Sequence, residues 1–154
     1  MKQKGLEARL VPGSDRTFAA LTRELDQEYV RRFGDVALRY RQYNGLENIQ
    51  TACLILKEGK AVACGGIQEL DERSAELKRV YVKPEHRKNG LGRMVVETLE
   101  LQALWQGYTR AALETGREMP EAISLYKRLG YREAEPWGPF VGDEICICMA
   151  KELE

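Results

Sequence analysis

The chain has 154 residues, 44% of them hydrophobic, and its 24 Lys and Arg balance its 24 Asp and Glu. This length suits one domain with a sizeable core, so we expect a single domain over residues 1–154. The balanced charge argues against a nucleic-acid or anionic-membrane binder, because both need an excess of basic residues. No apolar run approaches the roughly 20 residues of a membrane span, and residues 1–7 lack the apolar core of a signal peptide. We therefore expect a cytoplasmic protein without nucleic-acid or membrane partners.

The four cysteines predict buried, reduced thiols. Each lies in an apolar or alternating stretch, and none belongs to a Cys-x-x-Cys pair. A zinc site needs further ligands, and the single histidine is far from the cysteine pair at 146 and 148. We therefore expect neither a disulfide nor a metal ion. The four are Cys53, Cys64, Cys146 and Cys148.

In the first half of the chain, apolar periodicity predicts strands around one long helix. Ser14 or Asp15 is a suitable N-cap for this helix, and Gly34 ends it. Residues 35–49 are compatible with a short helix or a loop, and residues 58–60 are typical of a hairpin turn. The expected strands are residues 6–11, 51–57, 61–69 and 76–83.

The second half alternates helices with strands. A helix is expected over residues 89–106, and Pro120 opens another that Gly130 ends. Short strands are expected at residues 111–114, 131–135 and 144–151. This order predicts an α/β (α+β) fold, a mixed sheet with helices on both faces. The helix expected over residues 89–106 should direct one set of side chains inward, namely Leu91, Met94, Val95, Leu99, Leu101 and Trp105.

A glycine-containing loop between the 76–83 strand and the 89–106 helix carries the clearest chemistry. Gly90 and Gly92 let the backbone approach a ligand closely. They lie at a helix N-terminus, where unpaired N–H groups and the helix dipole favour an anion. Arg87, Lys88 and Arg93 add positive charge. The loop therefore predicts a cradle for phosphate or pyrophosphate, the alternative being a tight turn with a structural role alone.

The pattern of this loop resembles that of one enzyme family. Gly-x-x-x-x-Gly-Lys-Ser/Thr does not occur in the chain, and Val95 stands where Gly-x-Gly-x-x-Gly needs its third glycine. Residues 87–92 match Arg/Gln-x-x-Gly-x-Gly/Ala, which resembles the coenzyme A loop of the GCN5-related N-acetyltransferase (GNAT) superfamily. The resemblance covers about residues 74–133. It extends to that family's fourth strand (residues 76–84), its fifth strand (113–116) and the following helix and turn (122–131).

The resemblance implies a mostly antiparallel central sheet, splayed fourth and fifth strands, and acetyl-CoA as co-substrate. The backbone of Val80 and Val82 would pair with the pantetheine arm, and the N–H groups of residues 88–93 would hold the pyrophosphate. The acetyl thioester would lie between residues 81–82 and residues 113–114. Many relatives carry an asparagine just after the fifth strand, which this chain lacks. The implied cofactor-binding residues are Val80, Tyr81, Val82, Arg87, Lys88, Asn89, Gly90, Leu91, Gly92 and Arg93.

Acetyl transfer to an amine requires one proton to leave the amine and one to reach the departing thiolate. Glu76 is the first candidate for the base, through a water molecule, since some relatives carry a glutamate base on this strand. Strand alternation would place it on one face with Lys78, Val80 and Val82. The alternative is an ordinary ion pair with a nearby basic residue. Glu114, on the next strand, is the second candidate.

Tyr126 is the candidate general acid for the thiolate. It matches the tyrosine of the family's Leu-Tyr-x-x-x-Gly-Tyr/Phe pattern, here at residues 125–131. Its helical spacing with Ala122 and Leu129 would also suit a core residue, and a tyrosine can combine both roles.

Three other features are less specific. His86, the only histidine, is expected to be a solvated loop residue rather than a base. Trp137 is expected either to pack or to cover the acceptor site. Lys78 and Arg79 could meet a carboxylate on the acceptor.

These features together predict an acetyl-CoA-dependent N-acetyltransferase that acts on a primary amine of a small molecule. We expect direct transfer in a ternary complex, because no cysteine lies near the splayed strands in the matched region. The alternatives are a protein or peptide N-acetyltransferase, a non-catalytic acyl-CoA-binding module, and a phosphate-binding protein that uses the loop for a nucleotide. The sequence leaves open whether the protein is a homodimer, and it does not identify the acceptor.

Overall fold

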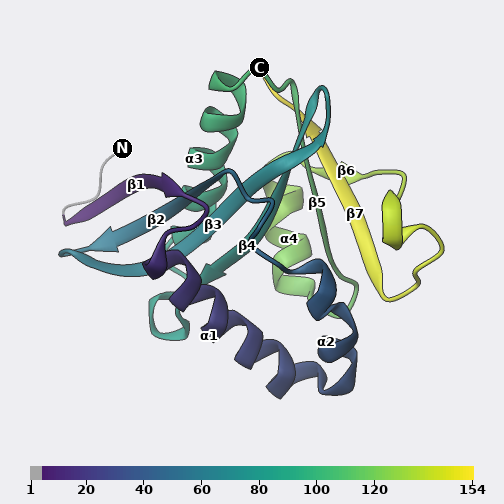
Figure 1. Cartoon of the computed structure of the whole chain (residues 1–154), viewed down its shortest axis with the longest axis horizontal. Helices are drawn as coiled ribbons and strands as arrows, with labels where there is room; N and C mark the ends of the chain where they lie inside the picture. The colour runs from purple at the N-terminus through teal and green to yellow at the C-terminus, as the bar shows by residue number, and fades with distance from the viewer. Residues whose placement is uncertain (1–4) are drawn as a thin grey trace. The chain divides into compact units, whose positions relative to one another are not determined.

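A computed structural model describes residues 5–154, which form seven strands, four α-helices and three short 3-10 helices (Figure 1). The order of these elements is the predicted one. Their bounds are β1 (Leu6–Pro12), α1 (Arg16–Phe33), α2 (Asp35–Tyr40), η1 (Arg41–Tyr43), β2 (Thr51–Lys57), β3 (Lys60–Asp71), β4 (Ser74–Val82), η2 (Pro84–His86), α3 (Leu91–Trp105), β5 (Arg110–Gly116), α4 (Pro120–Arg128), β6 (Arg132–Glu133), η3 (Gly138–Phe140) and β7 (Cys146–Glu152).

The strands join in the order β1-β2-β3-β4-β5-β7-β6. The pairs β1–β2, β2–β3, β5–β7 and β6–β7 are antiparallel. β4 and β5 are parallel, and Ser74–Glu76 pair with Arg110–Ala112. The fold is therefore a mixed, mostly antiparallel sheet flanked by four helices, which confirms the predicted fold class.

The chain divides into two compact units. The N-terminal unit contains the described residues up to Gln68 together with Leu77–Leu99, and the C-terminal unit contains Glu69–Glu76 and Glu100–Glu154. β4 begins in the second unit and continues into the first. The single domain expected over residues 1–154 stays a prediction, as does the splaying of β4 and β5 beyond their paired residues.

The N-terminal unit carries a helix on each face of its strands. Asp15 caps α1 by accepting a hydrogen bond from the Phe18 N–H. The apolar side of α1 packs on β2, β3 and β4. On the other face α3 approaches so closely that a Cβ added to Gly65 would lie 2.7 Å from Val95 Cγ1. The residues that share the α1 core are Phe18, Leu21, Leu25, Ile49, Ala52, Leu54, Cys64 and Tyr81.

The inward face of α3 differs from the prediction at its C-terminal end. Leu101 and Trp105 are 70% and 83% exposed, so the expectation that they face inward is wrong. The helix instead buries a stripe with a spacing of four residues, which matches the helical period, and turns the carboxylate Glu100 inward. The stripe consists of Leu91, Val95, Leu99 and Ala103.

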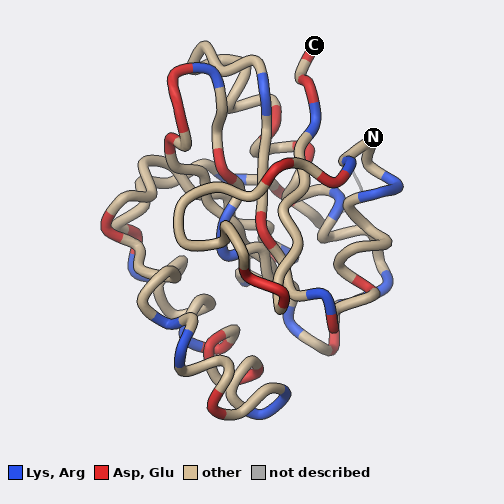
Figure 2. Tube along the Cα trace, turned by 90° about the vertical axis from the view of Figure 1, so that its right-hand side faces the viewer, with Lys and Arg blue, Asp and Glu red and all other residues tan. Residues whose placement is uncertain are grey.

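The predicted hairpin turn at residues 58–60 is confirmed. The turn between β2 and β3 places Glu58 at φ 50° and Gly59 at φ 82°, the left-handed pair that a tight hairpin requires. Lys and Arg are interspersed with Asp and Glu along the trace (Figure 2). No helix within residues 5–154 combines the length and apolarity that a bilayer crossing requires.

Candidate active site

The glycine loop links β4 to α3 through residues 87–90, all of which are exposed. The first helical hydrogen bond of α3 runs from the Met94 N–H to the Gly90 carbonyl, over 3.1 Å. Because an α-helix bonds each N–H to the fourth preceding carbonyl, the N–H groups of residues 91–93 precede this ladder. They point out of the helix start, where the dipole also favours an anion.

The backbone of this loop has the shape of an open cradle. Lys88 and Gly90 have φ values of 66° and 78°, both in the left-handed region. A Cβ added to Gly90 would meet no heavy atom within 4 Å, so the absent side chain leaves accessible backbone there. A non-glycine residue held in this region, such as Lys88, marks a conformation that its surroundings enforce. The loop therefore fits a phosphate or pyrophosphate group.

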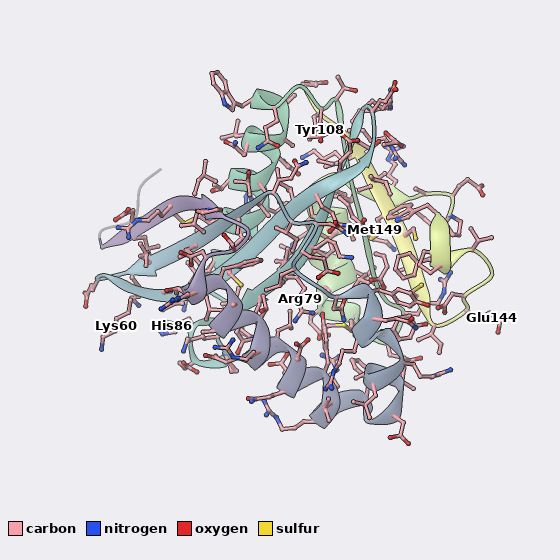
Figure 3. The ribbon with its side chains drawn as sticks, in the orientation of Figure 1. Lys60, Arg79, His86, Tyr108, Glu144 and Met149 are labelled. Carbon is pink, nitrogen blue, oxygen red and sulfur yellow. The ribbon has the colours of Figure 1, made fainter. Side chains whose placement is uncertain are left out.

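Arg87 was expected to add positive charge to the loop, but its side chain is bonded to neighbouring parts of the chain. Its Nε donates a 2.9 Å hydrogen bond to the Val82 carbonyl, and its guanidinium pairs with Glu28 of α1 at 2.6 Å. It also lies over the Tyr81 ring. These contacts tie the start of the loop to β4 and α1. His86 is half-buried in η2, just before the loop (Figure 3).

β4 changes the direction of its side chains at Arg79, whose φ is 60°. Lys78 donates to the Tyr43 carbonyl, and Arg79 also turns toward the helices, where it contacts Asp26 and Thr22 of α1 (Figure 3). Val80, next along the chain, faces the α3 side near Gly65. Strict alternation is therefore lost at this kink, as in a β-bulge. The prediction that Glu76 shares one face with Lys78, Val80 and Val82 is wrong for the valines.

Arg79 is not placed to meet an acceptor carboxylate. Its side chain is only 2% exposed and pairs with Asp26 at 2.5 Å, and the same guanidinium donates to the Thr22 carbonyl at 2.8 Å. The carboxylate that this arginine meets is therefore one of the chain's own, and that prediction is wrong for Arg79.

The two candidate bases lie on one face of the C-terminal unit's strands. Glu76 is the register partner of Ala112, and Glu114 lies two residues beyond Ala112 on β5. Paired residues and alternate residues share a face, so both carboxylates project to the same side. Glu76 is 5% exposed, and Glu114 is half-buried. The structure thus brings together two residues that lie 38 positions apart in the sequence.

Cys148 is a neighbour of these carboxylates that sequence reasoning missed. It lies directly across from Glu114 in the β5–β7 register. Burial raises the pKa of the Cys148 thiol, and the negative charges of Glu114 and Glu76 raise it further. A hydrogen bond with the Trp137 backbone acts in the opposite direction, but the pKa remains raised. A thiol held in its protonated form is a poor nucleophile. Only the pairing of β7 with β5, which no local pattern encodes, reveals this position.

Tyr126 lies in the last turn of α4, which is followed by a compact turn that ends at Tyr131. Gly130 has φ 98°. The Tyr131 N–H donates to the Tyr126 carbonyl at 2.9 Å, and the Gly130 N–H to the Lys127 carbonyl at 3.1 Å. This is the Schellman pattern, in which the first and last residues also pack together. The two rings meet edge to face with centroids 5.7 Å apart, and Tyr126 is 7% exposed.

The Tyr131 ring is held by two charged side chains, Glu100 and Lys151. The Tyr131 hydroxyl donates a 2.7 Å hydrogen bond to Glu100 of α3, and Lys151 of β7 pairs with the same carboxylate at 3.1 Å. Burial, followed by the charge of Glu100, raises the pKa of Tyr131 well above its usual value. Sequence reasoning missed Glu100 and Lys151, since both are charged residues that would ordinarily be assigned to the surface.

The tyrosines and the carboxylates occupy opposite faces of the same strands. Lys151 is the register partner of Ala111, whereas Glu76 pairs with Ala112, the next residue of β5. Adjacent strand residues point to opposite sides, so the Lys151 cluster lies on the face away from Glu76 and Glu114.

The remaining predictions concern metals, cysteines and Trp137. All four cysteines are buried and free. Within residues 5–154 no three His, Cys, Asp or Glu side chains are arranged to hold a metal ion. Trp137 is half-buried and packs edge to face on Phe140, with centroids 6.4 Å apart.

Comparison with known proteins agrees with this arrangement. The sequence model of the Acetyltransferase (GNAT) family matches residues 18–131. An IAA acetyltransferase from Azospirillum brasilense is 30% identical over 138 residues, which cover 84% of this chain and 89% of that protein. A crystal structure of a Klebsiella pneumoniae protein assigned as an acyl-CoA N-acyltransferase superposes with a TM-score of 0.79 and 29% identity, over 97% of this chain and 98% of that one. A GNAT acetyltransferase from Elizabethkingia anophelis with acetyl-CoA bound has the same fold, with a TM-score of 0.69, 15% identity and coverage of 98% and 100%.

These matches define the class of the protein as an acyltransferase with the GNAT fold. The chain belongs to the GNAT family of N-acetyltransferases.

Proposed function

We propose that this protein transfers the acetyl group of acetyl-CoA directly to a primary amine of a small molecule in a ternary complex. The observation that carries the proposal is the open glycine loop at the start of α3, in a chain that matches the GNAT family over residues 18–131. Acetyl transfer needs a base for the amine and an acid for the thiolate. The candidates for these roles are Glu76, Glu114 and Tyr126, all of the C-terminal unit.

The glycine loop is the proposed site for the pyrophosphate of acetyl-CoA. The N–H groups of residues 88–93 would bind it, and the backbone of Val80 and Val82 would pair with the pantetheine arm. The open space at Gly90 and the exposed N–H groups at the start of α3 support this assignment. When bound, acetyl-CoA supplies the acetyl group as an activated thioester.

Glu76 is the proposed base, with Glu114 as the alternative on the same face. An amine with a pKa near 10 is protonated at neutral pH, so its nitrogen must lose a proton before it can form the new bond to carbon. The Glu76 carboxylate would accept that proton through a water molecule. Its place on β4 beside Ala112 of β5, on the same face as Glu114, supports the assignment.

Tyr126 is the proposed acid. Its phenolic oxygen would donate a proton to the sulfur as the carbon–sulfur bond breaks, which avoids release of a free thiolate. The nitrogen would lose its second proton to solvent after it has bonded to the acetyl carbon. Tyr126 would then regain a proton from solvent and Glu76 would release its own, so that one cycle releases one proton and restores both side chains. The tyrosine pattern at residues 125–131 and the fixed turn at Gly130 support this role.

Direct transfer is favoured over an acetyl-enzyme intermediate. Cys148 lies beside Glu114, but the raised pKa of its thiol opposes nucleophilic attack. The relative from Azospirillum brasilense is named an IAA acetyltransferase, which favours a small-molecule acceptor for this chain as well. The four reduced thiols favour a cytoplasmic location.

Thiol release from acetyl-CoA tests the proposal, measured across amino acids, polyamines, aminoglycosides, IAA and short peptides. We expect turnover with a small amine. Tyr126→Phe should lower kcat by about 10²-fold without changing the dissociation constant of acetyl-CoA. Glu76→Gln and Glu114→Gln, compared at several pH values, distinguish the two bases. Tyr108→Phe is the control, since it removes the hydroxyl of another largely buried tyrosine, which bonds to Glu69.

Other outcomes would contradict parts of the proposal. Activity on peptides alone would replace the small-molecule acceptor by a protein acceptor. Tight binding of acetyl-CoA without turnover on any amine would indicate a non-catalytic acyl-CoA-binding module. Preferential binding of ATP over coenzyme A would overturn the assignment of the loop.

A further inference from the structure

We infer that Tyr131, Glu100 and Lys151 form a brace that positions the hydroxyl of Tyr126 for proton donation. Tyr131 is the member that contacts Tyr126, and the other two act through it, so all three are positioning residues. The inference rests on the proposed role of Tyr126 as the acid. It assigns a function to the buried polar group of the C-terminal unit, which the reaction itself does not require.

The first step is the backbone link between the two tyrosines. The Schellman turn fixes Tyr131 five residues after Tyr126 through a direct hydrogen bond between their main chains. The left-handed Gly130 makes this turn possible. Ring contact at 5.7 Å follows from the same geometry, so movement of one ring displaces the other.

The second step is the anchoring of the Tyr131 ring. Its hydroxyl donates to Glu100, and its ring lies 5.7 Å from the Lys151 ammonium, which pairs with the same carboxylate. The side-chain stem of Lys151 also passes 3.5 Å from where a Cβ on Gly130 would lie, so it covers the turn itself. Residues from α3, from β7 and from the end of α4 thereby converge on one ring.

The third step is that stability alone does not explain this group. Buried ion pairs contribute little compared with apolar residues of similar size, because both charges lose their hydration. α3 nevertheless turns Glu100 inward while the adjacent Leu101 is 70% exposed to solvent. The phase of α3, which buries Val96 and Leu99, turns residue 100 inward, and an apolar side chain at this position would be buried without loss of hydration. A carboxylate at this position is explained if it has a task on the inner side.

That task fits the needs of a general acid. A proton donor must lie within about 2.6–3.2 Å of the atom that it protonates, and a displacement of about 1 Å can cost up to about 10²-fold in rate. Rotation of the ring about its own axis leaves the hydroxyl oxygen in place, so the requirement is that the Tyr126 ring does not swing about its Cα–Cβ bond. The edge-to-face contact with an anchored Tyr131 restricts that swing.

A double-mutant cycle on the full-length protein tests the brace. Tyr131→Phe and Glu100→Gln are made both in the wild-type chain and in Tyr126→Phe, and kcat and acetyl-CoA binding are measured for each. We expect Tyr131→Phe to lower kcat by about fivefold to tenfold in the wild type, with acetyl-CoA binding unchanged. In the Tyr126→Phe background, Tyr131→Phe should not lower kcat further, because the hydroxyl that the brace positions is already absent. Glu100→Gln, which still accepts a hydrogen bond from Tyr131, should lose less than Glu100→Ala.

The outcomes separate this inference from the function on which it rests. An equal fold-loss in both backgrounds, or no loss in either, overturns the brace and leaves the acid role of Tyr126 intact. No effect of Tyr126→Phe itself overturns both, and no thiol release by the wild type overturns the proposed reaction. Should Glu100→Ala fail to fold, Lys151→Met provides the same comparison. Tyr108→Phe, which breaks the bond to Glu69, is expected to leave kcat unchanged in both backgrounds.

Discussion

Arg79 illustrates how one residue sets the geometry around it. It is a buried arginine in a left-handed backbone conformation inside a strand, which is uncommon for a residue with a side chain. The conformation moves the following side chains to the other face of β4, and the guanidinium joins the strand to α1. Sequence reasoning recognised that a charged residue here is unusual. It could not supply the partner, because Asp26 lies 53 positions earlier and no local pattern links the two.

Removing this side chain should be costly. Arg79→Ala leaves Asp26 without its ion pair and the Thr22 carbonyl without its donor, so we expect the free energy of unfolding to fall by about 3 kcal/mol. Arg9→Ala breaks an exposed ion pair with Glu7 and should change the free energy of unfolding by less than about 1 kcal/mol. Urea unfolding measures both variants. Equal effects would contradict the structural importance assigned to Arg79.

At the scale of elements, the glycine loop and its flanking strand and helix were predictable because they follow local rules. A helix N-terminus, two glycines and a preceding strand are read from adjacent residues, and the tyrosine turn at 125–131 is equally local. The inward face of α3 was not predictable at its end. Leu101 and Trp105 are apolar, but only the true helical phase and the presence of Tyr131 and Lys151 determine that Glu100 turns inward instead. Cys148 was missed for a similar reason, since its neighbour Glu114 is on a different strand.

The glycine loop should lose affinity when its backbone is constrained. A residue with a Cβ in the left-handed region costs about 1–2 kcal/mol, so in Gly90→Ala the free loop should relax to another conformation. Binding must then restore the original one, and the dissociation constant of acetyl-CoA should rise by about tenfold. Calorimetry measures this change.

The hairpin turn provides a matched control for that experiment. Gly59 has φ 82° and open space at its Cβ position, as Gly90 does, so Gly59→Ala introduces the same strain elsewhere. It should lower stability by a similar amount without affecting acetyl-CoA binding. Unchanged binding in Gly90→Ala would mean that the loop is not the phosphate site.

At the scale of the whole molecule, the buried thiols couple stability to pH. Burial raises the pKa values of Cys53, Cys64 and Cys146 to about 12, from a value of 9.0 for an exposed thiol. Above pH 9 the unfolded chain loses these protons while the folded chain keeps them. The folded state then binds more protons than the unfolded state, so stability decreases as pH rises. The contribution of the thiols is complete below pH 9 and is lost as pH approaches 12.

The free energy of unfolding should therefore fall between pH 9 and 12, by up to about 1.4 kcal/mol per pH unit for each thiol. Urea unfolding at pH 8, 9, 10 and 11 measures the slope. Cys53→Ala, which removes one of these groups, should make the decline shallower. A slope identical to that of the wild type would contradict the raised pKa of Cys53.

The opposed faces of the C-terminal unit also bear on how such a protein can change over generations. Because Glu76 and Glu114 project from one side of the strands and the tyrosine brace lies on the other, a substitution beside the carboxylates leaves the neighbours of Tyr126 in place. With the roles proposed above, selection can alter the residues around the carboxylates one at a time while the residues around Tyr126 are retained. A scaffold whose two halves vary independently can acquire new acceptors without rebuilding its chemistry.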